Sequence, residues 1–181
     1  EKIIWNDLVR GECVLDTSSV SDPIIVREDG RFIYTLASVI DDSDFEITHI
    51  IRGEDHVTNS AVQIQIFKAL NSNVPKMGHL SLMTDIDGGG LSKRIGSLSI
   101  NELKNQNIEP QVLTSYLAKI GSSQNVELQN SMKNLIDEFD INLFNKAPTK
   151  FDYEFLKNIN SKFFQLINFN IIKDRITENK L

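Results

Sequence analysis

The chain has 181 residues, of which 40% are hydrophobic and 24% are charged, with a formal net charge of −6 at pH 7. This composition is typical of a folded globular protein and excludes a chain that is disordered throughout. No apolar run approaches the roughly 20 residues that a transmembrane helix needs, and the single cysteine excludes an intrachain disulfide or a cysteine-rich zinc site. We therefore expect a cytoplasmic protein with no zinc in this segment. Because the chain starts at Glu1 without an initiator methionine, we expect it to be the interior of a longer protein.

The first segments of the chain are rich in Val, Ile and aromatic residues and are broken by polar turns. The pieces IIWNDLVRGECVL and PIIVREDGRFIY, the second with a Glu-Asp-Gly turn, have the composition of β-strands. A different kind of segment follows at residues 47–53, ITHIIRG, where the β-branched run hardly alternates with polar residues. Such a run predicts a strand that is buried on both faces of a parallel sheet.

A polar loop and a helix follow this strand. Ser60 and Gln63 have the spacing of an S-x-x-Q capping box, and apolar residues at helical spacing carry the helix to near Asn71. The next strand is predicted at residues 79–83. The order of strand, loop, helix and strand indicates an α/β fold with a parallel sheet, in which ligands bind beyond the carboxyl ends of the strands.

The loop RGEDHVTNS after the first of these strands is one candidate ligand site. Arg52 stands at the carboxyl end of the predicted strand, where its guanidinium group can clamp a carboxylate. Asp55 and His56 follow at positions where a ribose or a base can be hydrogen-bonded. The residues alone leave a second interpretation open, in which Arg52 forms a surface ion pair with Glu54 or Asp55.

A second candidate site is the stretch DGGGLSKRIGSLS at residues 87–99, which follows the second predicted strand. Its glycines allow close approach of the backbone to a ligand, and Ser92, Lys93 and Arg94 offer a hydroxyl group and two cations as donors. This combination suits a phosphate. The spacing fits neither the Walker motif nor the dinucleotide-binding fingerprint, so by itself the stretch also fits a solvated surface loop.

Beyond residue 98 the signals are helical, and we place a domain boundary there. Pro110 opens a helix whose apolar residues recur at helical spacing until Gly121 closes it. A second amphipathic helix is predicted at residues 132–139. Asp152 is expected to cap a third helix.

Three stretches together resemble bacterial glutamyl-tRNA synthetases. The segment DGRFIYTLASVIDDSDFEITHIIRGEDHVTNSAVQIQIFKAL is similar to the family's segment from D-G-x-P-T-Y to N-T-P-x-Q-I. GLSKR resembles the family's form of the class I KMSKS loop, usually K-L-S-K-R, and APTKFDYEFLKNINSKFF is similar to its F-D-x-x-K-L-x-x-L-N stretch. The resemblance covers nearly the whole chain and implies a central fragment of a synthetase.

The resemblance implies a fold and a domain order. Residues 1–30 would be the end of the acceptor-binding insertion, and residues 31–97 the second half of a class I Rossmann-type parallel sheet with its KMSKS-type loop. Residues 98–181 would be a truncated α-helical stem-contact domain. The family's His-Ile-Gly-His signature is not in this chain, and we expect the isolated chain to be inactive.

The resemblance also implies a reaction and its partners. The parent protein would join ATP and glutamate to form glutamyl-adenylate, with Mg²⁺ accompanying ATP, and then transfer glutamate to the 3′ end of tRNA. The expected tRNA is that for glutamate, with glutamine tRNA left open. No membrane partner is expected, and the parent protein is expected to be a monomer.

Individual roles are carried over from the resemblance. Tyr34, Ser38 and Arg52 match positions around glutamate, with Arg52 holding a carboxylate. Positions around ATP are matched by Asp55, His56, Met83, Gly90, Leu91, Ser92, Lys93 and Arg94. Ser92 and Lys93 carry the expected catalytic role, because Lys93 would oppose the charge that grows on the triphosphate. No metal ligand is expected.

Departures from the family pattern leave alternatives open. Gly90 replaces the first lysine of the KMSKS pattern, and Phe32 and Ile33 replace the usual Pro-Thr. The pair Asp41 and Asp42 has the composition of a general acid and base, but the family match makes it a structural turn. Alternatives to the ligase are a non-catalytic RNA-interaction protein derived from a synthetase, an enzyme that charges glutamine tRNA, and a glutamyl-queuosine synthetase. The long helical region disfavours the last of these.

Overall fold

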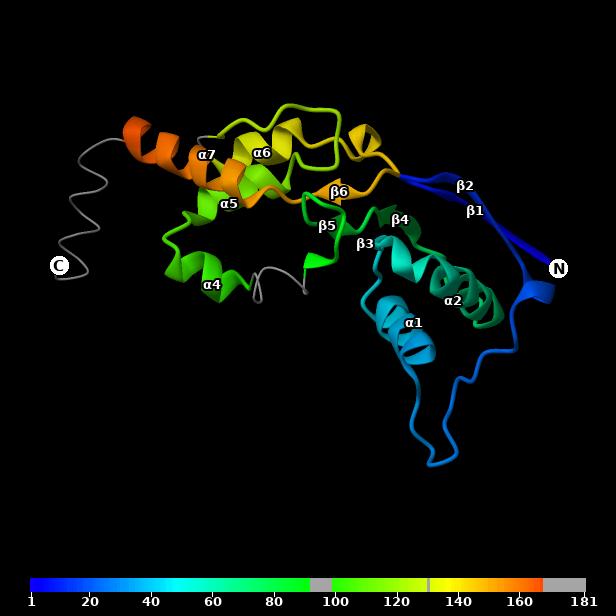
Figure 1. The fold of residues 1–181 in the computed structure, drawn as a ribbon. Coiled ribbons are helices and arrows are strands. Elements are labelled where there is room, and N and C mark those ends of the chain that lie inside the picture. The colour runs from blue at the N-terminus through cyan, green and yellow to red at the C-terminus, as the bar shows by residue number, and fades with distance from the viewer. Residues whose placement is uncertain (92–98, 130, 168–181) are drawn as a thin grey trace. The chain divides into compact units, whose positions relative to one another are not determined.

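The computed structural model describes residues 1–91, 99–129 and 131–167, traced in Figure 1. These residues divide into two compact units. Unit 1 contains residues 1–82 together with the later segment 141–147, which includes the short 3₁₀ helix Ile141–Leu143. Unit 2 contains the other described residues. Among the described residues, no helix is both long and apolar enough to cross a bilayer.

Unit 1 begins with an antiparallel hairpin of β1 (Lys2–Asp7) and β2 (Gly11–Asp16), in which Trp5 lies opposite Cys13. Asp7 shapes the turn, because its Oδ1 accepts hydrogen bonds from the backbone N–H groups of Val9 and Arg10 at 3.1 and 3.0 Å. The prediction of strands in this part of the chain is confirmed.

The second predicted extended piece, PIIVREDGRFIY, is mostly irregular. It follows a short 3₁₀ helix, Thr17–Ser19, and forms only an isolated bridge between Val26 and Phe32 around a turn at Gly30, whose φ is +81°. The bridge has no neighbouring strand in the described chain, so the strand prediction is wrong for most of this piece.

A helix that was not predicted follows directly. α1 (Tyr34–Asp44) packs against α2 (Val57–Ala69), and the core of unit 1 includes the fully buried Val39, Ala61 and Phe67. Asp41 and Asp42 lie in the last turns of α1. The interpretation of this pair as a structural turn is therefore wrong.

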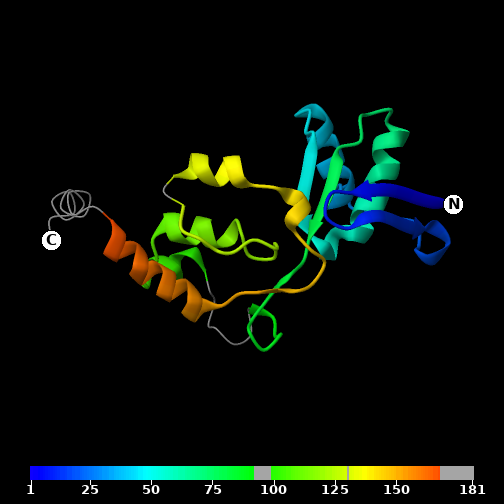
Figure 2. The ribbon, with the colours of Figure 1, turned by 90° about the horizontal axis from the view of Figure 1, so that it is seen from above.

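The parallel sheet of unit 1 pairs β3 (His49–Gly53) with β4 (Lys76–Leu80), which lie side by side in Figure 2. The strand predicted at residues 47–53 is confirmed. The next strand begins and ends earlier than predicted, at residues 76–80 rather than 79–83. The predicted burial of both faces is wrong, because Ile50 packs on the core while Ile51, on the other face, is 48% exposed.

The two ends of α2 differ in how well they were predicted. The helix follows directly on a 3₁₀ turn (Glu54–His56), and its N-cap residue makes no side-chain cap bond. Ser60 and Gln63 are fully buried inside the helix, so the capping box is wrong. The end near Asn71 is confirmed: Asn71 has a φ of +52°, and the N–H of Ser72 bonds to the carbonyl of Phe67 at 2.9 Å, as in a Schellman motif.

Unit 2 is mainly helical. Its elements are β5 (Met83–Thr84), α4 (Ile100–Asn105), α5 (Pro110–Leu117), α6 (Met132–Glu138), β6 (Thr149–Lys150) and α7 (Tyr153–Leu166). The helix starts predicted at Pro110 and Met132 are confirmed. Asp152 caps α7 as predicted, accepting a hydrogen bond from the N–H of Phe155 at 2.8 Å. β5 and β6 pair in parallel.

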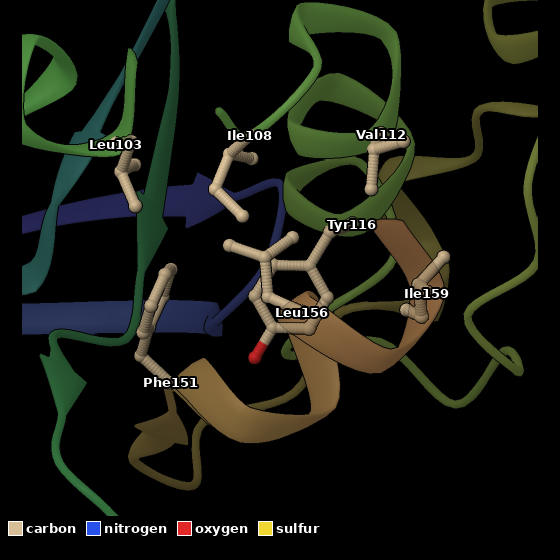
Figure 3. Packing of buried hydrophobic residues seen from close by; sticks show 7 residues of the cluster. All are labelled: Leu103, Ile108, Val112, Tyr116, Phe151, Leu156 and Ile159. Atoms are coloured by element: carbon tan, nitrogen blue, oxygen red, sulfur yellow. The ribbon is translucent and has the colours of Figure 1, made fainter. Parts of the chain in front are cut away.

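The core of unit 2 forms mainly between α5 and α7, as Figure 3 shows. Its buried hydrophobic residues are Leu103, Ile108, Val112, Tyr116, Phe151, Leu156 and Ile159. Tyr116 packs edge-on against Phe151 with 5.2 Å between ring centroids, and its hydroxyl oxygen accepts a hydrogen bond from the N–H of Asp152 at 2.7 Å. Burial raises the pKa of Tyr116. The phenol thus adds apolar area while its polar end stays paired.

Candidate functional site

Arg52 is the centre of the candidate site in unit 1. It lies near the carboxyl end of β3, opposite His79 of β4. Its Nη1 donates a hydrogen bond to the hydroxyl oxygen of Tyr34 at 3.0 Å. Its Nη2 donates to Ser60 Oγ at 2.5 Å and to Gln63 Oε1. Three neutral side chains from α1 and α2 therefore fix the plane of the guanidinium group.

The residues expected around glutamate come together in this cluster. Tyr34 is the first residue of α1 and bonds to Arg52 directly, with its side chain still half exposed. Ser38 lies one turn later in α1, and its Oγ accepts a hydrogen bond from Gln63 Nε2 at 2.6 Å. Gln63 thus links Ser38 to Arg52.

The positive charge of Arg52 is not neutralised by any described residue, because no described carboxylate forms an ion pair with it. Glu54 pairs instead with Arg10 at 2.6 Å, and Asp55 lies 3.8 Å from His56, so the surface ion pair with Arg52 is ruled out. The Nε–H of Arg52 is buried and has no acceptor among the described residues. A cation with a spare buried donor suits an incoming carboxylate.

Besides burial, the positive charge of Arg52 affects the pKa of Asp42, although these two described side chains form no ion pair. Burial raises the pKa of Asp42, while the positive charge of Arg52 acts in the opposite direction. Asp42 forms no ion pair with Arg52 within the described chain. Its place near the end of α1 makes it a neighbour of the site rather than a ligand of the guanidinium group.

The loop after Arg52 contacts residues of the β1–β2 hairpin and α1 through its side chains. A Cβ atom at Gly53 would lie 2.5 Å from Asp55 Oδ1, so a larger residue there would require the exposed Asp55 carboxylate to move. Glu54 accepts a hydrogen bond from Arg10 Nη1 at 2.6 Å. The ring of His56 lies 5.9 Å from that of Tyr34, and its buried Nδ1 has no partner among the described residues. Asp55 itself is exposed, which leaves its carboxylate open to a ligand.

The remaining expected ATP residues belong to unit 2. Met83 is half exposed in β5, Gly90 forms an isolated bridge to Thr84, and Leu91 packs on the core of the unit. Ser92, Lys93 and Arg94 lie outside the described residues.

Asp85 holds the base of this loop. The N–H of Asp85 bonds to the carbonyl of Gly89 at 2.8 Å, and Asp85 Oδ1 accepts from the N–H of Gly89 at 2.5 Å. Gly88 has a φ of +86°, a conformation that glycine adopts without strain. Among the described residues, no group of His, Cys, Asp and Glu side chains has the arrangement of a metal site.

Sequence reasoning missed several residues of the Arg52 cluster. Ser60 and Gln63 were noticed, but as a capping box rather than as acceptors for Arg52. Asp7 and His79 carried no local signal, since they are 72 positions apart and meet only through the fold. The one available sign was that His79 lies in a predicted strand of the parallel sheet, because a histidine that such a strand buries requires hydrogen-bond partners.

A comparison with protein families fits the arrangement of strands, helices and cluster. Residues 1–158 match the model of tRNA synthetases class I (E and Q), catalytic domain. The chain belongs to this family. The resemblance seen in the sequence is thereby confirmed, and the mixed helix and strand structure with its parallel strands matches a fragment of a class I synthetase catalytic domain.

Similar proteins carry the names of glutamate–tRNA ligases. Glutamate–tRNA ligase 2 of Hyphomonas neptunium is 47% identical over 176 residues, which cover 97% of this chain and 40% of the relative. The glutamate–tRNA ligase of Azospirillum brasilense is 50% identical over 166 residues, covering 91% of this chain and 37% of the relative. This class I synthetase chain thus spans about two fifths of the length of these relatives.

Solved structures agree with this family assignment. A glutamate tRNA ligase from Elizabethkingia meningosepticum, solved in complex with its amino acid, matches 100% of this chain and 41% of its own with a TM-score of 0.84 and 29% identity. Glutamate-tRNA synthetase from Elizabethkingia anophelis gives a TM-score of 0.77 at 27% identity.

Proposed function

We propose that this synthetase chain supplies the glutamate-binding side and the KMSKS-type loop of a glutamate–tRNA ligase. The observation that carries the proposal is the Arg52 cluster. A guanidinium group is oriented by Tyr34, Ser60 and Gln63, keeps a buried unpaired donor, and has no carboxylate partner among the described residues. Glutamate brings the missing carboxylate, which an arginine can hold through two charge-assisted hydrogen bonds.

The chemistry follows from the residues around this cluster. Arg52, with Tyr34 and Ser38 beside it, would hold glutamate. The α-carboxylate of the bound glutamate would then attack the α-phosphorus of ATP. Positioning and charge neutralisation do most of the work in such a phosphoryl or adenylyl transfer. The resemblance assigns contacts with ATP to Asp55 and His56 and, separately, to Met83, Gly90 and Leu91.

The KMSKS-type loop would supply the positive charge for pyrophosphate departure. A serine hydroxyl and two cations at Ser92, Lys93 and Arg94 form a donor set that suits a triphosphate. Mg²⁺ would be held mainly by the phosphate oxygens of ATP, a mode that this hydrated ion favours. Residues 98–181 are proposed to contact the stem of tRNA, and the parent protein to act as a cytoplasmic monomer.

The test uses the full-length protein, by which we mean a polypeptide that contains this chain and reaches the length of its relatives. Pyrophosphate exchange into ATP, with tRNA present, should depend on glutamate and should be far slower with glutamine. Arg52→Ala should raise the glutamate KM of this exchange about 10²- to 10⁴-fold, while Arg31→Ala, a control at an arginine whose side chain is 77% exposed, should leave it unchanged. Absence of glutamate-dependent exchange in the unmodified protein would favour a non-catalytic RNA-interaction protein instead.

A further inference from the structure

Three buried side chains form a hydrogen-bonded row behind Arg52. Ser60 Oγ lies 2.8 Å from His79 Nε2, and His79 Nδ1 lies 2.5 Å from Asp7 Oδ2. Ser60 and His79 are 0% exposed and Asp7 is 2% exposed. The row therefore runs from the carboxylate of Asp7 in β1, through β4 and α2, to the guanidinium group of Arg52 in β3.

The protons of this row can be assigned from chemistry. Burial raises the pKa of Asp7, but hydrogen bonds from the His79 side chain and from the backbone N–H groups of Arg10, Val9 and His79 together lower it below its ordinary value. Asp7 is thus a carboxylate at neutral pH and can only accept. The proton between the two residues must then belong to His79 Nδ1.

This assignment fixes the direction of the remaining hydrogen bonds. Ser60 Oγ already accepts from Arg52 Nη2, and its own hydroxyl proton needs an acceptor, which His79 Nε2 at 2.8 Å can be only if it carries no proton. The lone pairs of Ser60 Oγ are then free to accept from Arg52 Nη2, as the 2.5 Å contact requires. The side-chain donors of His79 and Ser60 then both have an acceptor, which a buried polar network needs to be stable.

The row has the same residue types as the Ser-His-Asp triad of a hydrolase. It differs from such a triad because a substrate cannot reach the serine and because the serine oxygen already has hydrogen-bond partners. Ser60 is fully buried, so no substrate carbonyl can reach its hydroxyl group. Its Oγ is also occupied by Arg52 and His79. A role in orienting Arg52 explains the contacts of the whole row and of Arg52 itself. Nucleophilic catalysis would explain only the row, and it would also require an opening beside Ser60.

We infer that His79 is a positioning residue that acts on the carboxylate-binding Arg52 through Ser60. This inference rests on the proposed function, because the advantage of a pre-oriented Arg52 is tighter binding of glutamate. An arginine that is held in place before glutamate arrives loses less conformational entropy on binding. His79 sets the orientation of the Ser60 hydroxyl group, Ser60 holds one side of Arg52 Nη2, and Asp7 keeps His79 in the tautomer that this requires.

The experiment compares three variants of the full-length protein by pyrophosphate exchange. Ser60→Ala removes the acceptor for Arg52, and His79→Asn keeps a donor for Asp7 but removes the acceptor for Ser60. Each should raise the glutamate KM about tenfold, as expected for one buried hydrogen bond, and change the ATP KM and kcat by less than about twofold. The control His49→Asn alters an exposed histidine of β3 whose side chain bonds to Thr48 and lies outside the row, and it should change nothing.

A spectroscopic measurement tests the row without any activity assay. Nitrogen NMR of the ¹⁵N-histidine-labelled full-length protein at pH 7 should show an imidazole that is protonated on Nδ1 and not on Nε2, and this signal should vanish in His79→Asn. If the vanishing signal is instead that of an Nε2–H tautomer or an imidazolium, the inference is overturned. It is also overturned if Arg52→Ala raises the glutamate KM while Ser60→Ala and His79→Asn leave it unchanged. If Arg52→Ala itself has no effect, the proposed function fails, and the NMR result still decides the arrangement of the row.

Discussion

Replacing Arg52 separates binding of a carboxylate by a planar guanidinium group from general attraction by a positive charge. Arg52 donates hydrogen bonds from Nη1 to Tyr34 and from Nη2 to Ser60 and Gln63. Its Nε–H is buried and has no partner among the described residues. A lysine has a single nitrogen, which cannot contact acceptors on both sides of the group and a ligand as well. We therefore expect Arg52→Lys to bind glutamate poorly although it keeps the charge.

The size of the effect follows from the hydrogen bonds that are lost. Each bond between a charged donor and a carboxylate contributes about 1.5–3 kcal/mol. Losing two of them in Arg52→Ala should raise the glutamate KM about 10²- to 10⁴-fold, and losing one in Arg52→Lys about 10- to 100-fold. The ATP KM should change little in either variant.

The assay is glutamate-dependent pyrophosphate exchange by the full-length protein at saturating ATP, followed by a titration of ATP at the highest soluble glutamate concentration. Thermal unfolding of both variants controls for loss of structure. A glutamate KM that stays at the unmodified value in Arg52→Ala would refute the assignment of Arg52 as the carboxylate ligand. An Arg52→Lys variant with normal glutamate KM would show that charge alone suffices.

Four further predictions concern the KMSKS-type loop, Asp7 and the isolated chain. In the full-length protein, Lys93→Ala should lower the rate of adenylate formation at least about a hundredfold with a smaller effect on ATP affinity, because the charge it opposes is greatest in the transition state. Gly90→Lys should tighten ATP binding or leave it unchanged. Pre-steady-state measurements of adenylate formation over a range of ATP concentrations distinguish an effect on the rate from an effect on ATP affinity. The pKa of Asp7 is lowered in the fold, so its carboxylate stabilises the protein above the unfolded-state pKa of about 4, and this contribution is lost as the pH falls through the lower folded-state value. Asp7→Asn should therefore reduce the free energy of unfolding by about 2 kcal/mol in urea titrations at pH 7 and by much less at pH 3; an equal loss at both pH values would contradict this. The isolated 181-residue chain, about two fifths of the length of its relatives, should show no glutamate-dependent exchange above a control without protein.

Local signals predicted several elements of this fold well. The β-branched run at residues 47–53, the proline at Pro110 and the capping aspartate at Asp152 act on the residues beside them, and the structure has a strand or helix at each place. α1 was missed because its N-cap residue, Ile33, makes no side-chain bond and β-branched residues within it favour strands. Packing against α2 supplies what the local sequence lacks.

The candidate site was predictable only in part. Tyr34, Ser38 and Arg52 could be named from the resemblance to a family, and the structure brings them together through Gln63. The contribution of His79 could not be named, because it depends on a strand pairing and on a hydrogen bond to a residue 72 positions earlier. Long-range polar contacts of this kind leave no periodic pattern in a sequence.

The late segment of unit 1 has a consequence for synthesis on the ribosome. Residues 141–147 belong to unit 1, although about 60 residues of unit 2 precede them in the chain. At a translation rate of about 5–20 residues per second, they emerge about 3 to 12 s after Leu82. The Arg52 cluster and the row of Asp7, His79 and Ser60 all lie within the first 82 residues of this chain, so they can assemble before residues 141–147 are synthesised. Residues 141–147 can join unit 1 only after this delay, so the completion of unit 1 has to wait for the synthesis of most of unit 2.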